Sequence, residues 1–260
     1  MIRITDGTTN VIRLGGGGGI QISGPSVPSG VTLTATTTAP SQTVTLQRVT
    51  PTGGTCVVSW GDGSADSTIA NGNTGTTTHV YAAAGAWPIV ISNASLMTYL
   101  DLRDEKLSWT VGPASPMPTG LTYLYLISLA GLTWTVGGAG ATMPTGLTYL
   151  YLYNLAGLTW TVGGAGATMP TGLTSLTYHN SLTQAAVNAA LWGFYQGTTT
   201  RTATGGTINV GGTNAAPSGT FQAPASCPVT VATPGKEVAH ALLNDGCAVG
   251  FNRWTTVTTS

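Results

Sequence analysis

The chain has 260 residues, of which only 6% are charged, and its eight basic and eight acidic side chains give a net charge of zero. Soluble proteins usually carry about a quarter charged residues, so polar uncharged side chains and glycine backbone must keep this chain in solution. The absence of a basic field excludes nucleic acid as an expected partner, and the absence of a long apolar run excludes a membrane. Near-zero net charge favours association, so we expect a protein that works within an assembly.

Residues 1–30 are predicted to form an N-terminal arm and linker. Ile2–Thr5 and Val11–Leu14 alternate apolar and polar residues around Asp6-Gly7, which is typical of a hairpin, and Ile20–Ser23 is predicted as a further strand. We expect the arm to attach the chain to a neighbouring protein by strand addition. The apolar residues expected to make this contact are Ile2, Ile4, Val11, Ile12, Ile20 and Ile22.

Residues 31–95 are predicted to form an antiparallel β-sandwich, because alternating runs follow one another between Gly, Pro and Asn turns. The predicted strands are Val31–Thr38, Gln42–Val49, Thr55–Trp60, Thr76–Tyr81 and Trp87–Ser92.

A motif in this segment points to a family. Trp60-Gly61-Asp62-Gly63-Ser64, followed by His79-Val80-Tyr81 and then by Gly85-Ala86-Trp87, resembles the polycystic kidney disease (PKD) type of immunoglobulin-like domain. Pro88 departs from that pattern, and because proline cannot donate to a β ladder we expect its strand to lie at an edge or to be bulged there. Asp62 is expected to accept backbone hydrogen bonds as in an Asx turn, since a calcium site with Asp66 would lack ligands.

Residues 96–180 are predicted to form a short β solenoid. Residues 121–146 and 147–172 differ only at Ile127/Tyr153 and Ser128/Asn154, and this 26-residue period is typical of stacked repeats. The spacing of leucines in each unit resembles leucine-rich repeats. Leu155 stands where that family usually has asparagine or cysteine, so we expect no asparagine ladder and turns closed by glycine instead.

The repeats predict two columns of aromatic residues. Alternation directs leucines inwards and tyrosines outwards, and stacking at about 4.8 Å per coil would align the tyrosines on one face. Such a ladder suits the binding of glycans or protein, but aromatic packing that only stabilises the sheet is the favoured interpretation. The ladder residues are Tyr99, Tyr123, Tyr125, Tyr149, Tyr151 and Tyr153. Trp109, Trp134 and Trp160 are expected to stack along the core.

Residues 181–260 are predicted to form an α/β cap. Helices are expected at Thr183–Tyr195, with Thr183 as the N-cap, and at Lys236–Leu243; strands are expected at Gly206–Val210 and Trp254–Thr258. This ending resembles the terminal caps of bacterial and phage repeat proteins, which cover the apolar edge of the last coil.

Few residues suggest chemistry. The segment Arg103–Lys106 holds four of the sixteen charged residues; an acid–base pair of Asp101 with Asp104 or Glu105 would need a pocket, so a solvated loop is favoured. A contact of this segment with the sandwich is the alternative. No catalytic, phosphate-binding or zinc motif occurs, and we expect no enzyme, no cofactor and no metal. A Cys227–Cys247 bridge and three buried thiols are both compatible with the cysteine count.

We therefore expect a mainly β protein: N-terminal β arm, immunoglobulin-like (PKD) β-sandwich, leucine-rich-repeat-like β solenoid and α/β cap. The combination resembles domains displayed on phage particles and bacterial surfaces. The start of the chain lacks the apolar core of a secretion signal, which favours a phage virion structural protein on the particle surface (head decoration, head fibre or tail adhesin). Its expected partners are capsid or tail proteins, further copies of itself and a host glycan or protein. The alternative is a bacterial cell-surface or secreted adhesin whose signal has been removed.

Overall fold

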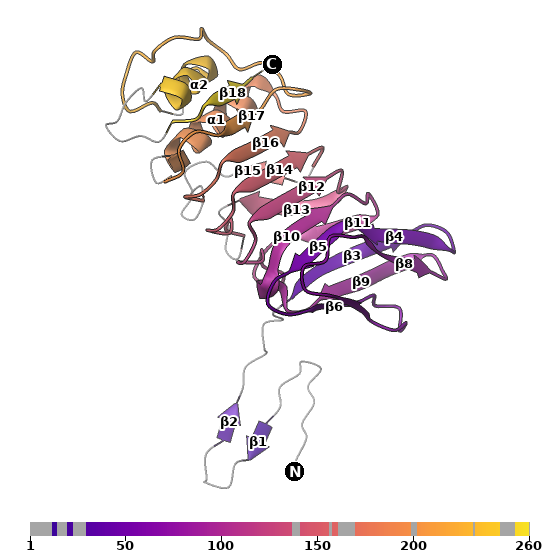
Figure 1. Cartoon of the computed structure of the whole chain (residues 1–260). Coiled ribbons are helices and arrows are strands. Elements are labelled where there is room, and N and C mark those ends of the chain that lie inside the picture. Colours follow the sequence, from indigo (N-terminus) through magenta and orange to yellow (C-terminus); the bar gives the residue numbers. More distant parts are fainter. Residues whose placement is uncertain are drawn as a thin grey trace.

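The computed structural model describes residues 12–14, 20–22, 30–136, 141–155, 158–160, 170–198, 202–230, 232–244 and 253–259. Within these residues the chain is mainly β, with two α-helices. Figure 1 shows the strands of the repeats stacked side by side between a first module at the N-terminal side and the helices at the C-terminal side.

In the arm, β1 (Ile12–Leu14) and β2 (Ile20–Ile22) form a two-stranded antiparallel sheet in which Ile12 is opposite Ile22. The strand at Ile20–Ser23 was predicted from the sequence, but its pairing with β1 was not. The predicted partner Ile2–Thr5 lies outside the described residues, and so do Ile2, Ile4 and Val11.

The first module, residues 30–95, contains seven strands, one of which the sequence did not predict. The strands are β3 (Val31–Thr37), β4 (Gln42–Leu46), β5 (Arg48–Pro51), β6 (Cys56–Ser59), β7 (Ser67–Ile69), β8 (Thr77–Tyr81) and β9 (Gly85–Ile91). Alternate residues of β3 are buried because one face of this strand lies on the core. Trp60 and Tyr81 anchor that core: the Tyr81 hydroxyl donates to the Trp60 carbonyl at 2.9 Å, and both side chains are almost fully buried.

The prediction of a single strand over Gln42–Val49 is wrong. β4 ends at Leu46 and pairs with β8, whereas β5 begins at Arg48 and pairs with the first strand of the repeats. The exposed residue Gln47 separates the two strands. The chain therefore leaves the sheet of β4 and β8 and joins the sheet of the repeats within two residues.

The expectation for Pro88 is met only locally, because β9 is an internal strand of its sheet and its register with β3 shows no bulge at Pro88. β9 pairs with β3 over its whole length, but its pairing with β6 covers only Val90 and Ile91. Pro88 therefore lies in the half of β9 that has one neighbouring strand in the sheet, where a missing N–H costs least. Gly61 packs on this proline: a Cβ at Gly61 would lie 2.3 Å from the Pro88 carbonyl oxygen, and its φ is +78°.

The repeats form parallel strands with the predicted period. The elements are the 3₁₀ turn η1 (Ala94–Leu96), β10 (Met97–Leu102), β11 (Leu107–Thr110), β12 (Tyr123–Ile127), β13 (Gly131–Val136), β14 (Tyr149–Tyr153), β15 (Leu158–Trp160) and β16 (Ser175–His179). β10, β12, β14 and β16 pair in parallel in this order, with Tyr123 opposite Tyr149. Leu124, Leu150 and Leu176 are fully buried below them, because each coil covers the apolar face of the next.

The predicted tryptophan stack is wrong in register. On the second sheet, formed by β11, β13 and β15, Trp109 is opposite Leu132 and Trp134 is opposite Leu158. The strands of this sheet are staggered along their length, so each tryptophan faces a leucine of the next coil. Trp109 and Trp134 are nonetheless almost completely buried, and their indole N–H groups donate to Ser115 Oγ and to the Ala141 carbonyl.

Both sheets of the repeats continue into the first module. β10 pairs antiparallel with β5, and β11 pairs antiparallel with β3. The two seven-stranded sheets therefore run in the orders β18-β17-β16-β14-β12-β10-β5 and β15-β13-β11-β3-β9-β6-β7. The predicted boundary at residue 95 is crossed by backbone hydrogen bonds in both sheets.

The cap elements match the prediction closely. They are α1 (Gln184–Thr198), β17 (Thr207–Asn209), α2 (Gly235–Asn244) and β18 (Thr256–Thr258). Thr183 caps α1, since its Oγ1 accepts from the Ala186 N–H at 3.4 Å. β17 and β18 extend the parallel sheet, and α1 packs on its inner face, where Phe194 lies 6.5 Å from Tyr178 ring to ring.

The expected absence of an asparagine ladder holds only for the inner coils. Leu129 and Leu155 are fully buried at the position where leucine-rich repeats usually have asparagine or cysteine. The neighbouring turns are closed by Ser128 and Asn154, both at φ +53°, rather than by glycine. At the cap, however, the Asn180 side chain bonds to both backbone groups of Leu155.

Asn214 makes the next step of this arrangement. Its Nδ2 donates to the Tyr178 and Val210 carbonyls at 2.6 and 2.9 Å, and its Oδ1 accepts from the N–H groups of Asn180 and Leu182. Two asparagines thus bond to the backbone where the repeats meet the cap.

We predict that a further copy of residues 121–146, inserted after residue 146, will fold and lengthen the molecule by about 4.8 Å, because the new coil pairs like its neighbours. Circular dichroism melting and small-angle scattering measure this. The matched control duplicates only residues 121–133, which breaks the register and should lower Tm sharply. An equal loss of Tm in both variants would contradict the additive stacking of coils.

We predict that Asn214→Ala lowers the free energy of unfolding by about 2–3 kcal/mol, because four backbone groups lose a buried partner. Asn244→Ala is the control, since its exposed amide bonds, among the residues that the structure describes, only to the His240 carbonyl; its effect should stay within about 0.5 kcal/mol. Urea denaturation of both variants measures the difference, and equal losses would show that the Asn214 bonds are not stabilising.

Candidate functional site

The six predicted ladder tyrosines lie together on the outer face of the parallel sheet. Tyr99, Tyr123 and Tyr149 form one row, and Tyr125 and Tyr151 form the next, with each residue opposite its counterpart on the neighbouring strand. Tyr153 begins a third row. We call the six residues Tyr99, Tyr123, Tyr125, Tyr149, Tyr151 and Tyr153 the tyrosine face.

The rings of the tyrosine face stack on one another. Neighbouring ring centroids are 4.8 to 6.4 Å apart and the ring planes are inclined by 18° to 26°. This offset stacking stabilises the sheet by about 0.5–1.5 kcal/mol per pair. It also covers much of each ring surface with the next ring, so the face presents mainly ring edges and hydroxyl groups; Tyr123 is the most open, with 41% of its surface exposed.

The central hydroxyl of the face is held by its neighbours. Burial raises the pKa of Tyr125, and hydrogen bonding to Tyr149 and Tyr99 raises it further. The phenol therefore stays protonated across the physiological range and serves as a donor as well as an acceptor. Tyr125 thus contributes a neutral hydroxyl to the tyrosine face.

Charged residues close one end of the tyrosine face. The Arg48 guanidinium lies 4.0 Å from the centroid of the Tyr99 ring, a cation–π contact. Asp101 takes the place of a tyrosine in the second row and is 3% exposed; Arg103 Nε and Nη2 each donate to one of its carboxylate oxygens at 2.7 Å. This hydrogen bonding raises the pKa of Arg103. At the other end of the tyrosine face, His179 of β16 lies against Tyr153 edge to face.

The charged segment 103–106 contacts the first module, which was the alternative to the favoured solvated loop. Asp104 Oδ2 accepts from the Thr45 N–H of β4 at 2.9 Å, and Asp104 Oδ1 accepts from the backbone N–H and the ammonium of Lys106 at 3.0 Å each. The Asp104 carboxylate is therefore fully engaged in joining the loop between β10 and β11 to β4.

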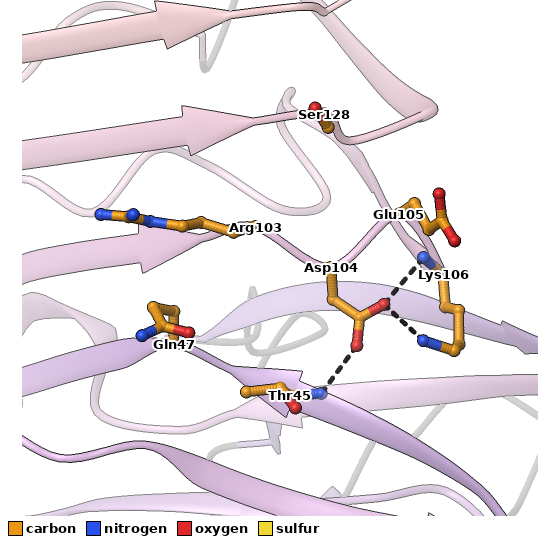
Figure 2. Close-up of a pocket in the computed structure, with 7 residues that line it drawn as sticks. All are labelled: Thr45, Gln47, Arg103, Asp104, Glu105, Lys106 and Ser128. Atoms are coloured by element: carbon orange, nitrogen blue, oxygen red, sulfur yellow. Dashed lines mark hydrogen bonds and ion pairs between the residues drawn. The ribbon is translucent and has the colours of Figure 1, made fainter.

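A pocket opens at this junction (Figure 2). It measures about 370 Å³ and lies between β4, the loop between β10 and β11, and the end of β12. We call it the junction pocket. The residues that line it are Thr45, Gln47, Arg103, Asp104, Glu105, Lys106 and Ser128. A second pocket of about 320 Å³ on the other sheet is lined by uncharged residues between Thr32 and Ser115.

The first module brings a serine, a histidine and an aspartate together, although the sequence suggested no such set. His79 Nε2 lies 2.7 Å from Asp62 Oδ2 and 3.5 Å from Ser64 Oγ. In a catalytic triad the carboxylate and the hydroxyl bind opposite ring nitrogens. Here both face the same nitrogen, so His79 cannot accept the serine proton while it is held by Asp62.

This cluster is instead a structural turn. Asp62 Oδ1 accepts from the Ser64 N–H at 3.0 Å, the predicted Asx turn, and the His79 ring stacks on Trp60 at 4.9 Å between centroids. Hydrogen bonding to Ser64 and then to His79 lowers the pKa of Asp62 from 3.8 to about 2.

Sequence reasoning singled out the charged segment 103–106 but missed the other residues that the junction assembles. Gln47 and Arg48 were placed inside a predicted strand, and Ser128 was one of two variable repeat positions without an assigned role. One signal was available: Asp101 and Arg103 are two residues apart, which places both on the same side of a strand. The contribution of β4 to the pocket had no local signal.

Within the described ranges, no group of three His, Cys, Asp or Glu side chains is arranged to hold a metal ion. In the same part of the chain, neither helix has the length and apolar character needed to cross a membrane. Cys56 is a buried free thiol and Cys227 is disulfide-bonded. Cys247, the predicted partner of Cys227, lies outside the described residues.

No protein-family profile matches the chain, and no match is found among curated proteins or solved structures.

We predict that Asp62 contributes to acid stability. Its pKa is lower in the folded chain, so its contribution is complete above about pH 4 and is lost as pH falls towards 2. Asp62→Asn should therefore lower Tm at pH 5 and flatten the decline of Tm between pH 4 and 2. Asp66→Asn, at an exposed carboxylate of the same turn region, should keep the wild-type profile. Identical acid profiles for Asp62→Asn and the wild type would refute this role.

Proposed function

We propose that this chain is a non-enzymatic structural protein of a phage virion, exposed on the particle surface as a head decoration, a head fibre or a tail adhesin. In this proposal residues 31–95 are a PKD-like sandwich and residues 96–180 are a leucine-rich-repeat-like solenoid. The arm attaches the chain to capsid or tail proteins, and the rest is displayed for stabilisation or for attachment to the host surface.

The observation that carries the proposal is the tyrosine face. Six stacked aromatic side chains form an ordered, uncharged surface on a continuous sheet, and tyrosine is enriched where proteins recognise partners because it offers large contact area at low entropic cost. Stacking between the rings adds to this order before any partner binds. A surface that is already ordered loses little entropy on binding.

The continuity of the sheet is also consistent with display on a particle surface. The sheet that carries the tyrosine face runs from β5 in the first module to β18 in the cap without interruption. A partner bound to this face would be held by one continuous sheet rather than by modules joined through a linker.

A second candidate is a bacterial cell-surface or secreted adhesin. One observation favours it: Cys227 is disulfide-bonded, and disulfides persist mainly in oxidising, extracellular surroundings. The tyrosine face would then bind host or community glycans or protein directly.

We predict that removal of residues 1–24 abolishes incorporation of the chain into phage particles, because the arm makes the attachment. Mass spectrometry of purified particles from the phage that encodes the chain measures its copy number. The control replaces Tyr149 and Tyr151 by alanine, which leaves the arm intact and should leave the copy number unchanged. Undiminished incorporation after the deletion would refute the arm's role, and absence of the full chain from particles would favour the adhesin.

A further inference from the structure

We propose that the junction pocket binds a neutral glycan unit, a hexose or N-acetylhexosamine within a host-surface polysaccharide. This inference rests on the proposed function, because it assigns the class of ligand that a displayed protein would recognise. The argument uses the fixed geometry of the pocket, its paired charges and its unused polar groups.

The charged groups of the junction pocket are held in place from behind. Asp104 is bound by the Thr45 N–H and by two donors of Lys106, and only 8% of its side chain is exposed. Arg103 is held by two bonds to the buried carboxylate of Asp101. A ligand therefore meets side chains whose positions are already fixed, which reduces the entropy lost on binding.

The ion pairs of the pocket also determine which ligand charge the pocket favours. Each cation of the pocket already has a carboxylate partner: Arg103 is paired with Asp101, and Lys106 with Asp104. Glu105 adds a negative charge that no ion pair within the described residues neutralises. A phosphate, sulfate or uronate would meet no free cation and one repelling carboxylate, so the pocket favours an uncharged ligand.

The unused hydrogen-bonding groups suit hydroxyls. The Gln47 amide and the Glu105 carboxylate are exposed at the rim, and Lys106 and Arg103 each keep N–H donors that their carboxylate partners do not use. Figure 2 shows Gln47 and Glu105 on opposite sides of Asp104, with Ser128 above Arg103 and Asp104 in this view. A sugar hydroxyl both donates and accepts, so adjacent hydroxyls can bond to a carboxylate and a cation at once.

The size and position of the pocket fit one sugar unit within a longer polysaccharide. A volume of about 370 Å³ lies at the lower end of ligand pockets, which measure about 300–1,000 Å³. Arg103 lies 6.0 Å from the centroid of the Tyr125 ring, so the pocket adjoins the tyrosine face. Further sugar units would contact the hydroxyl groups of the tyrosine face. They would not stack on its rings, because each ring covers much of the surface of the next.

The test is saturation-transfer difference NMR on the full chain. The probes are methyl α-glucoside, methyl α-mannoside, methyl β-galactoside and N-acetylglucosamine, with glucuronate and methyl sulfate as anions. We expect transfer to at least one neutral sugar, with a Kd on the order of 1 mM, and weaker or no transfer to the anions. Gln47→Ala and Glu105→Ala should each weaken this binding at least tenfold.

The matched control is Glu237→Ala on α2, which removes a carboxylate outside the pocket and should bind the sugar like the wild type. Transfer to none of the four neutral sugars, tighter binding of the anions, or wild-type binding by both pocket variants would overturn the inference, provided that melting curves show the variants folded. Particle incorporation of Gln47→Ala is measured separately and should be unchanged, so failure of the pocket is distinguished from failure of the virion proposal.

Discussion

The structure depends on backbone hydrogen bonding at the two ends of the repeat stack. A parallel coil offers unpaired N–H and C=O groups and apolar surface on both sides, so internal coils are stable only between neighbours. At the N-terminal end this need is met by antiparallel pairing of β5 with β10 and of β3 with β11. At the other end β17, β18 and the two helices close the stack, with Asn180 and Asn214 satisfying the backbone where the leucine pattern stops.

Local patterns predicted the parts of the fold that local interactions determine. The cap helices were found because a helix carries its own period and its own N-cap, Thr183, and the repeat period gave the register of the parallel sheet. The division of Gln42–Val49 was missed although the alternation changes phase at Gln47: Val44 and Leu46 are two residues apart, but the next apolar residue is Val49. The two halves also differ in their partner strands, β8 and β10. β7 was missed because Ser67–Ile69 is too short to show a pattern, and the stagger that separates the tryptophans depends on the pairing of whole strands.

Part of the candidate site could likewise be predicted from local patterns in the sequence, and part could not. Tyrosines that recur every 26 residues must align once the coils stack, so the tyrosine face was predictable from the sequence, although the covering of its rings was not. The junction pocket draws on β4, the loop between β10 and β11, and Ser128, which are far apart in the chain. A segment of mixed charges gave no indication that Asp104 would be bound by the backbone of Thr45.

The distribution of charge separates the contact area of the sheet from the charge of the protein, two properties that usually change together. Residues 121–172 contain no charged side chain, whereas Arg48, Asp101 and the segment 103–106 gather at the junction. Electrostatic effects of these groups fade over a Debye length of about 8 Å at physiological ionic strength. Gain or loss of a coil during evolution would therefore change the contact area along the sheet while the isoelectric point and the ionic-strength dependence of a partner's approach stayed the same.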